Sequence, residues 1–157
     1  MYKSILLTIM ACFLFTQVSA NNTGNAFKAV DAFFLAISEV DHKQMKKNVT
    51  KSFVLLEHGE VWSIDDLIDV VKPTDYKRDN YFSIINMKVY DNLVTVNYWN
   101  KANFHNENYN QNVIWLESAI IQKNKGKWRL SQMHSTRLPP GKEPKGAVFT
   151  KQKTPNQ

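Results

Sequence analysis

Cysteine is nearly absent from this sequence: Cys12 is the only one among 157 residues. A lone thiol excludes a disulfide framework and every zinc or iron–sulfur site that needs several thiolates. Glycine and proline are also scarce, at 5 each, which excludes collagen-like and low-complexity chains. No internal repeat is visible. A globular protein is therefore expected, and the length suits one domain rather than two.

Basic residues outnumber acidic ones, but the excess lies outside the centre of the chain. Of 20 basic residues, Lys3 belongs to the leader and four lysines belong to the tail 138–157, against Glu143 alone. The segment 21–137 keeps 15 basic and 13 acidic residues. A nearly neutral domain with a basic tail is not a phosphate-binding surface, so we predict no nucleic-acid partner.

The first twenty residues have the pattern of a secretory signal peptide. Lys3 supplies the positive start, residues 5–15 form the apolar core, and Val18-Ser19-Ala20 predicts cleavage after Ala20. The protein is then exported, periplasmic or secreted, with no stable membrane anchor after cleavage. Its mature form has no cysteine, which excludes thiol catalysis.

Two alternatives stay open for this leader. It could be a membrane anchor, but its apolar run is well short of the ~20 residues that span a bilayer. It could also be processed as a lipoprotein at Cys12, since residues 9–12 faintly resemble a lipobox. The residues after Cys12 stay apolar, which favours cleavage after Ala20 instead.

Hydrophobic periodicity and turn residues predict the order of elements. Apolar residues at three- and four-residue steps predict a long helix from residue 26, while Asp41 and Ser63 cap two shorter helices. A short strand at 53–58 separates these two. The order predicts an α+β fold in which a long antiparallel meander curls round the first helix. The four strands of this meander are expected at 80–90, 93–105, 111–123 and 127–137.

The predicted strand at 111–123 is apolar on both of its faces. One face carries Ile114, Leu116 and Ile120, and the other carries Val113, Trp115, Ala119 and Ile121. A strand buried on both faces needs cover on both sides, and one layer of helices supplies only one. We therefore predict a homodimer packed through the sheet. The alternative is that the short helices cover both faces within one chain.

Four fragments carry a resemblance to a known family. They are FVLLEHG at 53–59, WLESA at 115–119, GKWRL at 126–130 and HSTR at 134–137. In this order they resemble the nuclear transport factor 2-like superfamily, and more narrowly its SnoaL-like branch of small bacterial domains, related to the association domain of calmodulin-dependent kinase II. The resemblance covers about residues 26–138, and the closing strand is its most specific part.

The resemblance implies a cone-shaped α+β fold, in which a curved antiparallel sheet wraps the N-terminal helix and leaves a pocket at the open end. It also implies dimerisation through the sheet and a bacterial source. The superfamily includes ketosteroid isomerases, polyketide cyclases and dehydratases, but also binding and assembly modules. Function therefore has to be argued from the site rather than from the fold.

Glu117 is the first candidate for chemistry. It shares a strand face with Trp115 and Ala119. A carboxylate among apolar neighbours is costly without a partner, so its pKa should rise, which suits a general acid or base. The alternative is a structural carboxylate paired with Arg, Lys or Tyr, or one at the dimer interface.

His134 is the second candidate, because regular alternation places it on the face of Trp128 and Leu130. It could bind an anionic ligand or carry a proton near neutral pH. More often, a histidine on such a face is a core residue satisfied by its neighbours. If Glu117 and His134 met across adjacent strands, they would form an acid–base pair.

The remaining candidates are ligand contacts. Glu57 and His58 end the short strand and point to opposite faces, so one of them should face the cone interior. The others are Trp62, Tyr81, Tyr98 and Trp115. The histidines are too scattered for close metal-ligand spacing, so we expect no metal and no cofactor. The proline-containing tail at 138–157 is expected to be disordered.

These observations favour an exported, dimeric SnoaL-like domain that binds a small apolar or weakly anionic molecule. One alternative is an isomerase, cyclase or dehydratase acting by proton transfer in the cone, with Glu117 and His134 as the pair. The other is an assembly module without a ligand. The sequence does not identify the ligand or substrate.

Overall fold

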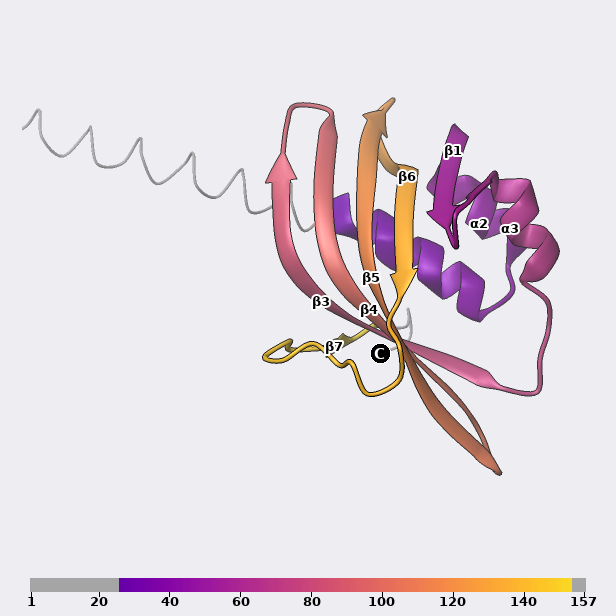
Figure 1. Cartoon of the computed structure of the whole chain (residues 1–157). Helices are drawn as coiled ribbons and strands as arrows, with labels where there is room; N and C mark the ends of the chain where they lie inside the picture. The colour runs from indigo at the N-terminus through magenta and orange to yellow at the C-terminus, as the bar shows by residue number, and fades with distance from the viewer. Residues whose placement is uncertain (1–25, 154–157) are drawn as a thin grey trace, which may run out of the picture.

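The computed structural model of the chain describes residues 26–153 (Figure 1). The predicted signal peptide at 1–20 and the end of the tail at 154–157 lie outside the described residues. Within 26–153, no helix is both long enough and apolar enough to cross a membrane.

Three helices precede or interrupt the first strands. The N-terminal helix is described over residues 26–38, and its predicted apolar stripe is buried. α2 (His42–Asn48) begins at Asp41, whose carboxylate accepts a 2.9 Å hydrogen bond from the first turn. α3 (Ile64–Val70) begins at Ser63, which forms a capping box with Asp66. Both predicted caps are confirmed, because each supplies an oxygen to a backbone N–H that has no helical partner.

A single seven-stranded sheet carries the rest of the described chain, in the order β2-β1-β6-β5-β4-β3-β7. The predicted run of four strands is confirmed, with ends that differ by a few residues. Two strands, β2 and β7, were not expected from the sequence. The bounds are β1 (Val49–Glu57), β2 (Glu60–Trp62), β3 (Lys77–Val89), β4 (Leu93–Asn106), β5 (Tyr109–Asn124), β6 (Lys127–Arg137) and β7 (Thr150–Lys151).

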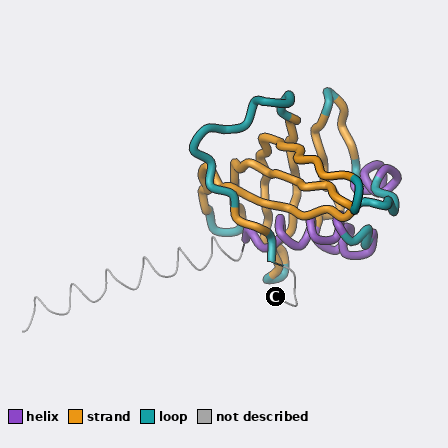
Figure 2. The backbone as a smooth tube through the Cα atoms, turned by 90° about the horizontal axis from the view of Figure 1, so that it is seen from below, coloured by secondary structure: helices purple, strands orange, loops and turns teal. Residues whose placement is uncertain are grey.

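The sheet is mixed rather than wholly antiparallel as predicted. β1 and β6 run parallel, while the other pairs are antiparallel. A parallel pair needs a long connection, and here β2, α3 and the strands β3 to β5 lie between the two in the chain. Figure 1 shows the long strands curving over the N-terminal helix, and Figure 2 shows the helices gathered on one side of the strands. The predicted α+β fold with a curved sheet over this helix is confirmed.

Aromatic rings fill most of the space between the helix and the sheet. Phe27 lies edge to face with Phe82 at 5.6 Å and with Tyr98 at 5.5 Å, measured between ring centroids. Phe33 lies 5.7 Å from Phe53 of β1. Edge-to-face pairs add to the stability of simple burial. A small cavity lies beside Phe33 under the sheet.

A β-bulge in β6 corrects the predicted strand faces. Ile120 pairs with Gln132 and Ile121 pairs with Leu130, so Ser131 is an extra residue without a partner. One extra residue moves every later side chain to the opposite face. Beyond Ser131, the residues that face the helix are therefore Met133 and Ser135, both buried, whereas His134 is exposed on the outer face.

The C-terminal segment also differs from the expected disordered tail. Residues 138–153 are described, and β7 pairs with the edge strand β3 through Phe82 and Thr150. Gln152 is buried with only 9% exposure. The proline and lysine content of this segment predicted disorder. Composition could not show that the segment would find a hydrogen-bonding partner in the free edge of β3.

Candidate functional site

A cavity of about 110 Å³ lies between the N-terminal helix and the concave face of the sheet. Cavities of this order admit a small organic molecule. The apolar part of the lining is Phe33, Phe34, Ile37, Leu55, Leu67, Val71, Trp115 and Met133. The polar part is Glu57, Arg78, Asn100, Glu117 and Ser135. A few convergent polar groups among apolar walls are typical of a ligand site.

Glu117 is the most buried carboxylate of this cavity, at 4% exposure. β5 places it between Tyr98 on β4 and Ser135 on β6. Its Oε1 accepts hydrogen bonds of 3.3 Å from Asn100 Nδ2 and 3.2 Å from Ser135 Oγ. Oε2 has no hydrogen-bond partner among the described residues.

Burial raises the pKa of Glu117 to about 7. The Tyr98 hydroxyl, the Asn100 amide, the Arg78 cation and the Ser135 hydroxyl act in the opposite direction, but together they do not offset the loss of solvation. The rise that the sequence predicts from Trp115 and Ala119 is thus confirmed. Near pH 7 the carboxyl exchanges a proton readily, and the proton is expected on Oε2, because Oε1 already accepts two hydrogen bonds.

Tyr98 lies directly opposite Glu117 in the β4–β5 pair and is fully buried. Burial, together with the neighbouring Glu117, raises its pKa well above the usual value, so its hydroxyl stays protonated. Tyr98 Oη lies close enough to Glu117 to act on its pKa, but within the described chain neither Tyr98 Oη nor Glu117 Oε2 has a partner with good hydrogen-bond geometry, and Asn100 Oδ1 has none either. Unpartnered buried polar atoms are rare in folded proteins and call for an explanation, and three of them here belong to adjacent residues.

Arg78 brings a positive charge to the cavity. Its guanidinium carbon lies 5.5 Å from the ring centroids of Phe34 and Phe104 and 5.8 Å from that of Trp115, at distances that favour cation–π attraction. Nε donates a 2.8 Å hydrogen bond to Asn80 Oδ1. Burial lowers the pKa of Arg78 to about 10, and Glu117 and Glu57 oppose this shift, so Arg78 remains a cation at neutral pH.

No ion pair in the described residues neutralises this cation. Glu117 and Glu57 act on Arg78 only through their fields, and Glu117 is half-protonated near pH 7. The terminal guanidinium nitrogens make no hydrogen bond to a described side chain or backbone group. The site therefore presents a half-buried cation, flanked by aromatic rings, beside a proton-carrying carboxyl, a pair that suits an anionic oxygen group.

Four of the predicted site residues meet here. Glu57, Trp115 and Glu117 line the cavity, and Tyr98 lies beside Glu117. Glu57 is thus the residue of the Glu57–His58 pair that faces the interior, as the alternation predicts, while His58 is exposed in the β1–β2 turn with a positive φ of 54°.

The other predicted residues lie elsewhere. Trp62 is half-buried on β2 and donates a 2.7 Å hydrogen bond to Glu60. Tyr81 lies at the β3 edge under Lys101 and Lys151. His134 pairs with Ser118 on the outer face, so it cannot meet Glu117, whose partner is Ser135. The condition for a Glu117–His134 acid–base pair is therefore not met, because strand alternation alone does not reveal the bulge at Ser131.

Sequence reasoning missed Arg78, Asn100 and Ser135. Arg78 falls in a stretch taken for a loop, since the predicted strand begins at 80, whereas β3 begins at Lys77. Asn100 could have been found, because alternation places it on the face of Tyr98 and Ala102. Ser135 could be found only with knowledge of the bulge.

The described residues contain no group of three or more His, Cys, Asp or Glu that could hold a metal ion. Nothing in the cavity fits a metal or a cofactor in particular. Its polar lining groups are two carboxyls, a cation, an amide and one hydroxyl, which suits an organic ligand.

Comparisons with known proteins support the fold. No family model and no curated protein matches the chain. Among solved structures, a protein of unknown function from Mycobacterium tuberculosis superposes with a TM-score of 0.71 at 12% identity, over 85% of this chain and 81% of that one. The CaMKII hub homology domain from Chlamydomonas reinhardtii gives 0.68 at 14%, over 75% and 99%.

A ketosteroid isomerase-like protein from Erwinia carotovora gives a TM-score of 0.59 at 17% identity, covering 74% of this chain and 96% of that one. None of these three is described as SnoaL-like, so that narrower assignment stays a prediction. At such low identity the likeness bears on the fold alone. The curved sheet and these neighbours agree: this chain has the nuclear transport factor 2-like fold, shared with ketosteroid isomerase-like proteins and CaMKII association domains.

Proposed function

We propose that this protein is an exported, dimeric binding protein for a small, partly apolar molecule with a carboxylate or similar oxygen anion. The observation that carries the proposal is Arg78: a cation held by three aromatic rings, without an ion pair, at an apolar cavity that also holds Glu117. A cation in that position costs desolvation, which an anionic ligand would offset.

Recognition would use two polar contacts and apolar walls. The ligand anion accepts hydrogen bonds from the guanidinium nitrogens of Arg78 and from the proton on Glu117 Oε2. The apolar body of the ligand packs against Phe33, Leu55 and Met133. Charge-assisted hydrogen bonds fix the orientation, and the apolar walls supply most of the affinity.

The experiment is a titration with benzoate, a carboxylate with a small ring, followed by protein NMR at pH 6. Arg78→Met should weaken binding by about tenfold or more, because a hydrogen bond to a charged group contributes about 1.5–3 kcal/mol. The matched control Arg137→Met removes an exposed arginine and should leave the affinity unchanged. Equal affinity of the wild type and Arg78→Met would contradict the proposal.

Ionisation of Glu117 provides a second test of the same site. Above pH 7 the Glu117 carboxyl loses the proton that it would donate to the ligand. The resulting carboxylate then repels the carboxylate of the ligand. We expect benzoate to bind about tenfold or more weakly at pH 8.5 than at pH 6, and Glu117→Gln to remove most of this difference. An affinity in the wild type that does not change with pH would show that Glu117 does not face the ligand.

A second candidate function is proton transfer on a bound carbonyl compound. The specific observation is the pair of Glu117, with a pKa of about 7, and the protonated hydroxyl of Tyr98. The carboxyl could exchange a proton at carbon while the hydroxyl stabilises the developing oxyanion. In this candidate function Tyr98, rather than His134, is the partner of Glu117.

The test uses cyclohexanone as a small ketone probe in deuterated buffer. If the site transfers protons, the α-hydrogens should exchange faster with the wild type than without protein, and Glu117→Gln should abolish the acceleration. Tyr98→Phe should slow the exchange without abolishing it. No acceleration by the wild type, while benzoate binds, would leave binding alone as the function of the cavity.

Export is supported by residues 1–20, and dimerisation by the outer face of the sheet, where Leu116 is 40% exposed. CaMKII hub and association domains among the structural neighbours suggest that this fold suits assembly. For export, expression of the full chain in a bacterial host should yield periplasmic protein beginning at Asn21. Cytoplasmic protein that begins at Met1 would contradict export.

A further inference from the structure

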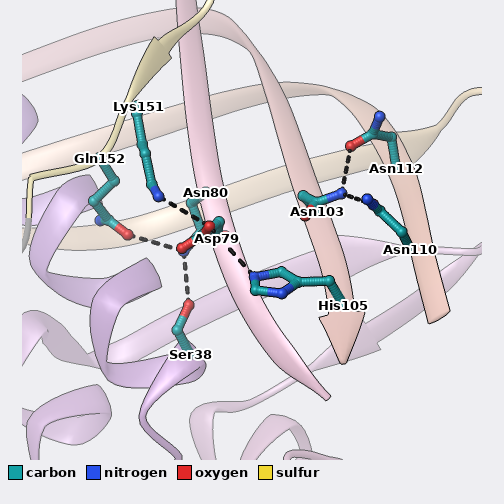
Figure 3. Close-up of polar contacts among 9 residues, drawn as sticks. All are labelled: Ser38, Asp79, Asn80, Asn103, His105, Asn110, Asn112, Lys151 and Gln152. Atoms are coloured by element: carbon teal, nitrogen blue, oxygen red, sulfur yellow. Dashed lines mark hydrogen bonds and ion pairs between the residues drawn. The ribbon is translucent and has the colours of Figure 1, made fainter. Parts of the chain in front are cut away.

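The end of the described chain is attached to the sheet by side chains that point in two directions. We name residues 149–152 the C-terminal clamp. On one side, Lys151 Nζ lies 2.9 Å from Asp79 Oδ2, and His105 Nε2 lies 3.5 Å from the same oxygen (Figure 3). On the other side, Gln152 enters the protein interior and contacts Asn80 (Figure 3).

Asn80 connects the clamp to the N-terminal helix. It is 2% exposed. Its Nδ2 donates to Gln152 Oε1 at 2.9 Å and to Ser38 Oγ at 2.8 Å (Figure 3), and it also lies 3.3 Å from the backbone oxygen of Phe34, a longer hydrogen bond. Its backbone oxygen accepts a 2.8 Å hydrogen bond from the backbone N of Gln152. Gln152 Nε2 donates to the backbone oxygen of Asp31. The carboxamide of Asn80 is thereby held in one orientation.

That orientation determines which group the carboxamide oxygen, Asn80 Oδ1, contacts. Since both protons of Nδ2 are used, Oδ1 is left to accept the 2.8 Å hydrogen bond from Nε of Arg78, which lines the cavity. This is the only side-chain hydrogen bond that Arg78 makes in the described residues. If Asn80 turned over, its NH₂ group would face the Arg78 N–H, and two donors would oppose each other.

We propose that the C-terminal clamp positions Arg78 for anion binding: Gln152 orients Asn80, and Asn80 orients the guanidinium at the cavity. The inference rests on the proposed binding function for its consequence, but the positioning itself does not need a ligand. Gln152 and Asn80 are not among the residues that line the cavity. They are positioning residues that act through Arg78.

The experiment compares two neighbouring substitutions in the clamp. Gln152→Met keeps the length of the side chain and removes both of its hydrogen bonds. Lys151→Met, the matched control, removes the exposed ion pair with Asp79 and the cation–π contact with Tyr81, both on the other side of the clamp. An exposed ion pair of this kind contributes little. The first measurement is the side-chain Nε–H signal of Arg78 by NMR without ligand, assigned by its loss in Arg78→Met. The backbone spectrum verifies that each variant is folded.

The expected result is that Gln152→Met shifts or broadens the Arg78 Nε–H signal, whereas Lys151→Met leaves it in place. Benzoate affinity at pH 6 should fall about threefold to tenfold in Gln152→Met and stay unchanged in Lys151→Met. Asn80→Ala should give the same change of the Arg78 signal as Gln152→Met, since both remove the orienting contact.

Three outcomes would overturn the proposal. The first is an Arg78 signal that does not change in Gln152→Met. The second is an equal change in Lys151→Met, which would mean that any loosening of the clamp has this effect. The third is a changed signal with unchanged benzoate affinity. Failure of the wild type to bind benzoate overturns the proposed binding function instead, and the Arg78 signal then still decides whether the clamp positions Arg78.

Discussion

Glu117 combines burial with a proton that it can lose near neutral pH, and this affects the stability of the folded protein. Its pKa is about 7 in the folded state against 4.5 in an exposed glutamate. Between these values the folded protein holds a proton that the unfolded chain has released. Stability from this group is therefore complete below about pH 4.5 and is lost as the pH rises to 7.

This difference predicts the effect of Glu117→Gln. The neutral amide of glutamine has no charge to desolvate. The variant should therefore not lose stability as the pH rises from 4.5 to 7 in the way that the wild type does. From pH 4.5 to pH 8 the free energy of unfolding should fall by about 3 kcal/mol more in the wild type than in Glu117→Gln. Urea unfolding of both proteins at the two pH values measures the difference. Parallel changes in the two proteins would contradict the raised pKa.

The burial of a single residue can be predicted from the sequence where its neighbours along the chain determine its environment. Trp115 and Ala119 flank Glu117 on one strand face, so alternation alone predicts its burial and its raised pKa. Arg78 cannot be assessed in this way. The rings around it come from the N-terminal helix, β4 and β5, and no local pattern links these distant segments.

At the scale of the element, the bulge in β6 decides which side chains of its second half face the cavity. Ser131 is the extra residue, and its Oγ donates a 3.1 Å hydrogen bond to Ile120 O. Because successive side chains of a strand point to opposite faces, the one extra residue at Ser131 decides which face each later side chain of β6 occupies. Helix ends differ in this respect: the caps at Asp41 and Ser63 could be predicted because a cap acts within three residues.

Deletion of Ser131 tests the role of the bulge. A regular strand would turn Met133 and Ser135 outward and His134 inward, or else strain the pairing with β5. Loss of the buried Met133 side chain alone predicts destabilisation by about 2–5 kcal/mol. Ser131→Ala keeps the bulge and loses only its hydrogen bond, which predicts about 1 kcal/mol. Urea unfolding compares the two, and equal stability would show that the bulge does not fix these faces.

At the scale of the whole molecule, the outer face of the sheet is the surface where a second copy would dock. Leu116 is 40% exposed there, and Trp99, its partner across the β4–β5 pair, is half-buried. The helices gather on the other side of the strands (Figure 2), so the alternative of intramolecular cover for both faces is not supported. A second copy, related by two-fold symmetry, would cover the apolar side chains.

Leu116→Glu tests this proposal, because a carboxylate in the centre of a two-fold interface would face its own copy and lose solvation. The mature wild type should sediment as a dimer at micromolar concentration and Leu116→Glu as a monomer. The control Val61→Glu alters a side chain that is 73% exposed on β2 and should remain dimeric. A monomeric wild type would contradict the dimer.

The sequence by itself determined what depends on neighbours along the chain: the helix caps, the four long strands, the α+β class and the burial of Glu117. Periodicity and capping act over a few residues, so they can be recognised without a structure. Only the tertiary structure decided that Arg78 lies among three rings, that His134 faces away from Glu117, and that Gln152 binds Asn80. Each of these depends on strand register or on a sheet edge, where the contacting residues are far apart in sequence and one extra residue reverses the result.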